Sequence, residues 1–167
     1  MSLDTEIGAA YNQQITREFA AAYQYLAMGA WLDERSFPGM ATWMRLQAEE
    51  EWDHAMRFYQ FVLDRNGSVE LGPIEAPTTD FATPLAVFEA ALAGEQDVTG
   101  RIHALYALAQ ERKDYASFPL LDWFVNEQVE EESTVTQIID DLARADGEGH
   151  SLLMLDRELG ARTPDSH

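Results

Sequence analysis

Residues 44–58, MRLQAEEEWDHAMRF, contain the pattern that decides the fold. Met44, Glu51 and Phe58 are spaced by seven, so they lie on one face of a helix, and His54 lies one turn beyond Glu51. Charged groups in the middle of an apolar face are unusual, because an unpaired buried carboxylate is very costly. The stretch therefore predicts a long helix with metal-ligating groups on its core face.

Proline divides the rest of the chain into similar segments. The six prolines are at positions 38, 73, 77, 84, 119 and 164, and the long stretches between them are rich in the helix-favouring residues Ala, Leu, Glu, Gln and Met. We expect four long helices, over about 4–35, 38–65, 84–112 and 118–145, and a short fifth helix over about 150–159. Gly67, with Asn66, and Gly147 with Gly149 are expected to end the second and fourth helices.

The segment 67–83, with two prolines and two glycines, is expected to be a long crossover between the second and third helices. A bundle needs such a crossover when its second helix pair starts at the same end as its first pair. The sequence thus predicts an all-α fold, a long four-helix bundle with a long crossover and a short fifth C-terminal helix. It is expected to form a single domain over 1–167, with a frayed tail over about 160–167.

Composition excludes several classes of function. Thirty acidic residues against eleven basic ones give a formal charge of −19, which argues against nucleic-acid binding. The chain has no cysteine, so disulfides, thiolate metal sites and iron–sulfur clusters are excluded. No apolar run is long enough to span a membrane, and no secretory signal is visible, so we expect a cytoplasmic protein without a membrane partner.

The other long helices repeat the interrupted apolar face. Their heptad series are Tyr11, Glu18, Tyr25 and Leu32; Phe88, Glu95, Ile102 and Ala109; Leu121, Gln128, Val135 and Leu142; and Phe124, Glu131 and Ile138. Glu18 precedes Glu51 by 33 residues, and Glu95 precedes Gln128 by the same number. The nearby arginines do not lie on these helix faces and so cannot pair with the carboxylates. A bound cation is therefore the expected partner of the carboxylates. Carboxylate-bridged di-iron bundles have a single glutamate ligand on each of two helices. Each of their other two helices carries a pair of ligands three residues apart.

With these residues, the sequence resembles the ferritins, specifically the haem-free bacterial ferritins, over essentially its whole length. The resemblance implies that Glu18, Glu51 and His54 hold one iron and that Glu51 bridges to a second iron held by Glu95, with Glu131 or Gln128. It also implies a third iron site, at positions matched by Glu50, Glu127, Glu130 and Glu131. Tyr25, two turns from Glu18, is expected either to hydrogen-bond the site or to be transiently oxidised.

Two departures distinguish the chain from the haem-binding bacterioferritins. Those proteins have a second Glu-x-x-His pair, whereas Glu130 stands here at the histidine position. They also bind haem between subunits through a methionine directly after a glutamate ligand of the first Glu-x-x-His pair, and here that residue is Trp52. No haem is therefore expected.

The resemblance implies a ferroxidase that oxidises Fe(II) with O₂ or hydrogen peroxide and stores ferric mineral in a hollow homo-oligomer of 24 subunits. It places Glu111, Asp114 and Asp122 near the pores of that shell. Alternatives left open are a standalone rubrerythrin-like di-iron peroxidase without mineral storage, a dodecameric mini-ferritin and an acidic structural bundle without metal. The complete ligand set within one chain argues against the mini-ferritin, and the carboxylates on the apolar faces argue against the structural bundle.

Overall fold

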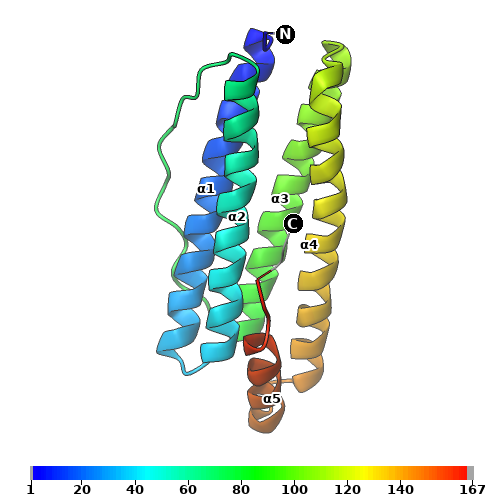
Figure 1. Cartoon of the computed structure of the whole chain (residues 1–167). Helices are drawn as coiled ribbons and strands as arrows, with labels where there is room; N and C mark the ends of the chain where they lie inside the picture. Colours follow the sequence, from blue (N-terminus) through cyan, green and yellow to red (C-terminus); the bar gives the residue numbers. More distant parts are fainter. Residues whose placement is uncertain (1, 165–167) are drawn as a thin grey trace.

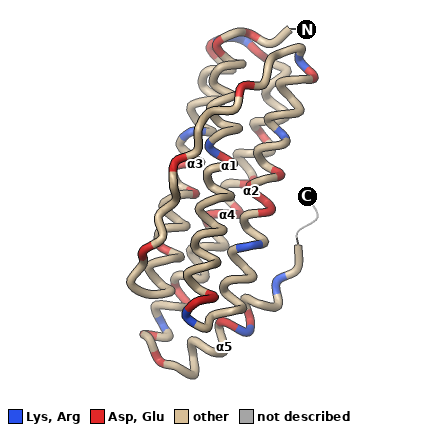
Figure 2. The backbone as a smooth tube through the Cα atoms, turned by 90° about the vertical axis from the view of Figure 1, so that its left-hand side faces the viewer, with Lys and Arg blue, Asp and Glu red and all other residues tan. Residues whose placement is uncertain are grey.

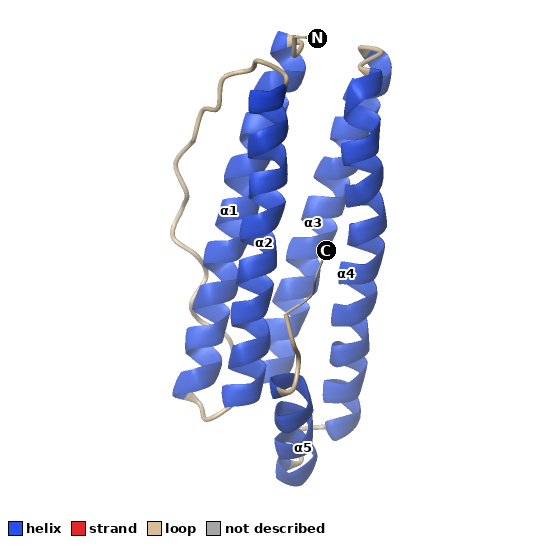
Figure 3. Cartoon of the chain, in the orientation of Figure 1, coloured by secondary structure: helices blue, strands red, loops and turns tan. Residues whose placement is uncertain are grey.

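The computed structural model describes residues 2–164, and within them it is built of helices without strands (Figure 3). The long helices are α1 (Thr5–Glu34), α2 (Pro38–Asp64), α3 (Pro84–Glu111) and α4 (Phe118–Ala145). A 3₁₀ turn, η1 (Tyr115–Ser117), precedes α4, and the short helix α5 (Gly149–Gly160) follows it. The predicted all-α fold with a four-helix bundle, a long crossover and a short fifth helix is confirmed.

The helix boundaries follow from local capping. Asp4 Oδ1 accepts hydrogen bonds from the backbone N–H groups of Glu6 and Ile7 at the start of α1, and Thr83 Oγ1 accepts one from Ala86 N at the start of α3. Each of α2, α3 and α4 has a proline in its first turn, where the missing N–H costs nothing.

Left-handed residues end the long helices. Ser36, Asn66, Lys113 and Asp146 have positive φ and lie one or two residues beyond the ends of α1 to α4. Gly147 has φ 72° and continues the turn after α4, as expected. The prediction that Gly149 helps to stop this helix is wrong, because Gly149 is the first residue of α5, whose N-terminus is capped by the Glu148 carboxylate.

The crossover runs along the outside of α1 and α2 from one end of the bundle to the other (Figure 1). Its backbone is fastened by three side chains of α1. Asn12 exchanges hydrogen bonds with Ser68 O and Glu70 N, at 2.8 and 2.9 Å. Thr16 Oγ1 accepts one from Gly72 N, and Gln24 makes a matching pair with Thr78. These hydrogen bonds partner main-chain groups of a segment that has no sheet neighbour, and they hold the crossover against α1.

The apolar core consists of two clusters. One contains Tyr25 and Met28 of α1 and Met40 and Met44 of α2, together with Phe88 of α3. The other gathers residues from the opposite halves of the same helices. Between the two clusters, every long helix contributes buried polar side chains, namely Glu18, Glu51, His54, Glu95, Glu127, Gln128 and Glu131.

Many exposed positions of the helices also carry acidic residues. Figure 2 shows Asp and Glu along the whole length of the bundle, with Lys and Arg far fewer. None of the helices within residues 2–164 is both long and apolar enough to cross a membrane.

Asp114 is buried at one end of the bundle, and its expected place near a pore of the shell stays a prediction. Its carboxylate receives two hydrogen bonds from the Arg65 guanidinium, at 2.7 and 3.2 Å, and one from Ser117 Oγ at 2.5 Å. Burial alone would raise the pKa of Asp114, but the hydrogen bonds from Arg65 and Ser117 and the Arg65 charge hold it below its ordinary value. This ion pair ties the end of α2 to the turn before α4.

We predict that Asp114→Asn lowers the free energy of unfolding by about 3 kcal/mol, because it removes the carboxylate that pairs with the buried Arg65 charge. The thermal midpoint of the metal-free protein should fall by roughly 6–12 °C. The matched control is Asp97→Asn, which breaks the exposed Arg101–Asp97 pair and should change unfolding by less than about 1 kcal/mol. Equal effects of the two variants would contradict a special role for the buried pair.

Candidate metal centre

The polar layer between the two apolar clusters brings one carboxylate or more from each long helix to the middle of the bundle. Glu18, Glu51 and Glu95 are each no more than 2% exposed. The helices cannot rotate to expose these carboxylates to solvent, because the same helix faces carry core residues one and two turns away. Charged groups held inside in this way require compensation.

Three of the predicted ligands form a compact group. Glu18, Glu51 and His54 each offer a ligand atom, and these atoms lie within 4.8 Å of one another. His54 Nδ1 is 3.3 Å from Glu51 Oε2. Glu18 Oε1 accepts a hydrogen bond of 2.7 Å from Gln14, whereas the buried Glu18 Oε2 has no hydrogen-bond partner. An orphaned carboxylate oxygen beside an imidazole and a second carboxylate fits a site for a cation.

A second group shares the same histidine. His54, Glu127 and Glu131 also offer ligand atoms within 4.8 Å of one another, and His54 Nε2 is 3.9 Å from Glu127 Oε1. Sequence reasoning assigned Glu127 only to the third site and placed His54 beside Glu18 and Glu51. The structure puts the imidazole between the two sets, with one ring nitrogen toward each.

Glu95 lies in the layer but outside both compact groups. Its carboxylate is occupied by hydrogen bonds from Tyr25 Oη, at 2.5 Å, and from Gln128 Nε2, at 3.2 Å. Gln128 Nε2 also lies 3.1 Å from the Glu95 carbonyl and 3.2 Å from Thr99 Oγ1. The Gln128 carbonyl oxygen is buried without a hydrogen-bond partner. Tyr25 therefore contacts the predicted ligand Glu95 directly.

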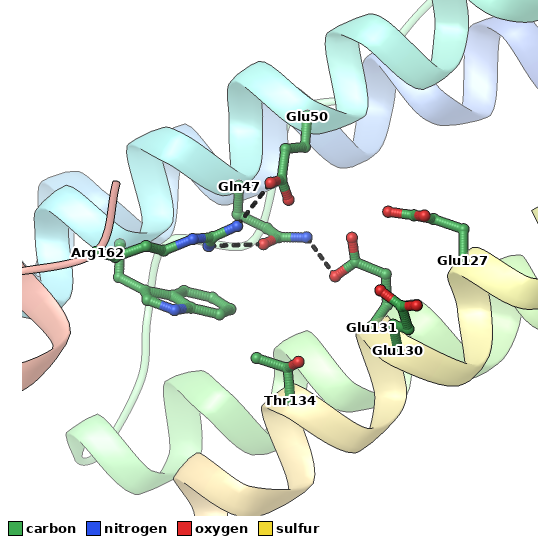
Figure 4. Close-up of a pocket in the computed structure, with 8 residues that line it drawn as sticks. Gln47, Glu50, Glu127, Glu130, Glu131, Thr134 and Arg162 are labelled. Carbon is green, nitrogen blue, oxygen red and sulfur yellow. Dashed lines mark hydrogen bonds and ion pairs between the residues drawn. The ribbon is translucent and has the colours of Figure 1, made fainter. Parts of the chain in front are cut away.

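The remaining predicted residues line a cavity of about 250 Å³ between α2 and α4. Figure 4 shows Glu50 on one side of this cavity, and Glu127, Glu130 and Glu131 on the other. Glu130 is exposed, Glu50 is half-buried, and Glu127 and Glu131 are buried. All four residues predicted for the third site thus meet at one cavity, which adjoins the central layer through Glu131.

Sequence reasoning missed Gln14, Gln47 and Arg162. Gln14 donates to Glu18, and Gln47 Nε2 donates to Glu131 Oε2 at 2.6 Å and lies 3.5 Å from Glu51 Oε1. Each glutamine stands four residues before a predicted glutamate ligand, which is one turn along the same helix face. That spacing could have identified both. Arg162 binds Gln47 and Glu50 from the C-terminal segment, for which the sequence held no signal.

The crowded carboxylates shift one another's protonation. Burial raises the pKa of Glu18, and the charge of Glu51 raises it further. Burial and the charges of Glu95 and Glu131 likewise raise the pKa of Glu51. Burial raises the pKa of Glu131 to about 8, with further contributions from the charges of Glu95 and Glu50. Without a cation, the layer therefore retains protons at neutral pH, and an entering cation must displace them.

The fold and the site together define a four-helix bundle with a carboxylate-rich, histidine-containing metal centre. The family model of the ferritin-like domain matches residues 8–145. A relative from Staphylococcus haemolyticus named bacterial non-heme ferritin is 41% identical over 163 residues, which cover 98% of each chain. A Staphylococcus aureus relative of the same name is 40% identical over 156 residues, covering 93% of this chain and 94% of the relative.

Solved structures give the same result. The open pore ferritin of the hyperthermophilic archaeon Archaeoglobus fulgidus is 40% identical, with a TM-score of 0.95 over 97% of this chain and 100% of the other. A closed form engineered from the Archaeoglobus fulgidus ferritin is 39% identical, with a TM-score of 0.97 over 98% of this chain and 100% of the other. The chain belongs to the ferritin family. Membership supports iron storage and ferroxidase chemistry in general terms.

We predict that the metal-free protein becomes less stable as pH rises from about 4.5 to about 8. An unfolded glutamate loses its proton near 4.5, whereas Glu131 in the folded chain keeps it until about 8. In that window the folded state binds more protons, so the free energy of unfolding falls with rising pH. Thermal midpoints measured across this range with a chelator present test the sign.

Glu131→Gln should raise the midpoint at pH 8 and flatten the decline, because it removes a buried charge that has no cation. The exposed Glu89→Gln on α3 is the control and should leave the slope unchanged. A wild-type midpoint that rises between pH 4.5 and 8 would show that the centre does not hold raised carboxyl pKa values.

Proposed function

We propose that this protein is an iron-storage ferritin that oxidises Fe(II) at a centre inside each subunit and deposits ferric mineral within a hollow shell. The observation that carries the proposal is the orphaned Glu18 Oε2, buried beside Glu51 and His54 within the reach of one cation. A structural bundle would pair such an oxygen or replace the residue with an apolar one, which is often more stable.

Iron is the substrate that suits this set of donors. Carboxylate oxygens with a single imidazole favour iron over copper or structural zinc. In the proposed arrangement, Glu18, Glu51 and His54 hold one Fe(II), and Glu51 bridges to a second Fe(II) held by Glu95 with Gln128 or Glu131. The buried Gln128 carbonyl oxygen that lacks a partner supports its role as a donor. Loading releases the protons that the layer keeps at neutral pH.

The oxidation balances with two irons. Each Fe(II) gives up one electron, and O₂ takes the two electrons with two protons to become hydrogen peroxide. When hydrogen peroxide is the oxidant, the same two electrons and two protons convert it to two waters. Carboxylate-rich surroundings stabilise Fe(III) relative to Fe(II), so the site favours the forward direction.

Tyr25 orients the Glu95 carboxylate through its 2.5 Å hydrogen bond. Burial, followed by the charge of Glu95, raises the pKa of Tyr25, so its hydroxyl keeps its proton and remains a donor. Tyr25 can act as a fixed hydrogen-bond donor or as a transient electron donor, and only the second role oxidises the tyrosine.

We further propose that ferric iron leaves through the third site formed by Glu50, Glu127, Glu130 and Glu131, that 24 cytoplasmic subunits assemble into the shell, and that no haem is bound. The acidic surface would concentrate Fe(II) around such a shell.

The first test is aerobic addition of Fe(II) to metal-free protein, followed by size exclusion with iron measured across the column. We expect many irons per chain to elute with an assembly of several hundred kilodaltons. About two irons per chain on a small oligomer would contradict storage and favour a rubrerythrin-like peroxidase. No retained iron would contradict the metal centre itself.

Glu18→Ala should lower the initial rate of Fe(II) oxidation by at least about tenfold, since even outer ligand contacts have effects of that size. The exposed Glu49→Gln on α2 removes one acidic charge outside the centre and should keep the wild-type rate. Stopped-flow absorbance of ferric species gives both rates. An unchanged rate in Glu18→Ala would remove this residue from the site.

Tyr25→Phe separates the two roles of the tyrosine. A positioning role predicts a rate about 10–100-fold lower without any tyrosyl radical in the wild type. An electron-donor role predicts a radical signal in the wild type, seen by electron paramagnetic resonance during oxidation and lost in Tyr25→Phe. A variant with the wild-type rate and the same signal would exclude both.

A further inference from the structure

The segment after α5 turns back and runs along the outside of the bundle, over the face formed by α2 and α4 (Figure 1). Residues 165–167 lie outside the described residues, and for them the predicted frayed tail stays a prediction. Arg162, within the predicted tail, instead packs against α2 with a side chain that is 16% exposed. Residue 162 therefore has a defined position against α2.

That position is set by the docking of α5 on the start of α2. The buried Asp156 accepts a hydrogen bond of 2.9 Å from Met40 N and so caps α2 from a distant part of the chain. A Cβ atom on Gly39 would lie 1.7 Å from the Asp156 carbonyl oxygen, and one on Gly160 would lie 2.8 Å from Gly39 Cα. Only glycines permit this backbone contact, which fixes where residue 162 emerges.

The Arg162 guanidinium is the cation found at the acidic cavity. It lies 2.8 Å from Glu50 Oε1, donates to Gln47 Oε1 at 2.9 Å, and sits 4.8 Å from the ring centre of Trp43 (Figure 4). Glu50 is one of the four carboxylates that line the cavity. The guanidinium thus neutralises one of the carboxylates that an entering metal ion would bind.

Gln47 connects the same guanidinium to the metal centre. Its amide oxygen accepts from Arg162, which directs its amide nitrogen to Glu131 Oε2, 2.6 Å away. Glu131 belongs to both the cavity and the ligand group of His54. Arg162 therefore contacts one cavity carboxylate directly and a second through one side chain.

We propose that Arg162 is a tethered cation that competes with metal ions for the Glu50–Glu127–Glu130–Glu131 cavity and so controls how readily an ion occupies it. The inference rests on the proposed function, in which that cavity is the third iron site. A guanidinium stays charged at any physiological pH, so the competition does not depend on titration of the arginine. A metal ion must displace Arg162 from Glu50, or bind with one carboxylate fewer.

The test uses Zn(II), which binds carboxylates and imidazole without redox chemistry, titrated into the metal-free assembly by calorimetry. We expect two tightly bound Zn(II) per chain and a weaker third. Arg162→Ala should strengthen the third by about tenfold, the size expected from removing one partly buried charge. Arg162→Gln, which keeps much of the side-chain volume, should do the same, and the two tight ions should change by less than about threefold.

The matched control is Arg157→Ala, which removes the same charge from the exposed face of α5 and should leave all Zn(II) affinities unchanged. In Arg162→Ala combined with Glu50→Gln, the gain should disappear, because the carboxylate that was freed is gone. Circular dichroism melting confirms that each variant is folded.

An unchanged third affinity in both Arg162 variants would overturn this inference and leave the proposed function standing, provided that two tight ions still bind. The same gain in Arg157→Ala would also overturn it, because the effect would be one of overall charge. Failure of the wild type to bind Zn(II) at the two tight sites would instead contradict the proposed function.

Discussion

The structure depends on a layer of carboxylates that the helices hold inside the bundle although water is excluded there. The layer divides the apolar core into two clusters, and each long helix crosses from one cluster to the other through it. Burial raises the pKa of Glu18, Glu51 and Glu95, so ionising these carboxylates without a cation costs stability. Cations relieve that cost, which links metal affinity to the folding free energy.

Within this layer, neighbouring groups have different degrees of hydrogen bonding. Glu95 is held by Tyr25 and Gln128, whereas Glu18 keeps one oxygen without a partner. His54 stands between two ligand groups and packs its ring against Trp123 and Phe124, which fixes its orientation. A centre with one firmly oriented carboxylate, one open carboxylate and a single imidazole offers mostly hard oxygen donors to a metal ion.

Sequence reasoning went furthest where the physics is local. The seven-residue spacing placed Glu18, Glu51 and Glu95 on buried faces, and the starts expected near residues 4 and 84 lie within a residue of the observed helix starts. It failed where distant segments meet. The shared position of His54 depends on how aromatic rings pack, the burial of Asp114 depends on Arg65 of another helix, and the site of Arg162 depends on a backbone contact between α5 and α2.

That backbone contact has a consequence for how the protein can vary. Because Gly39 and Gly160 meet without side chains between them, the distance from α5 to α2 is independent of the residues on the outer face of α5. Leu153 and Met154 on that face are about half exposed. Mutations can therefore change the residues on this outer face of α5, while the segment that follows α5 keeps its position against α2. Such separation lets surface contacts diverge during evolution without altering the chemistry in the middle of the bundle.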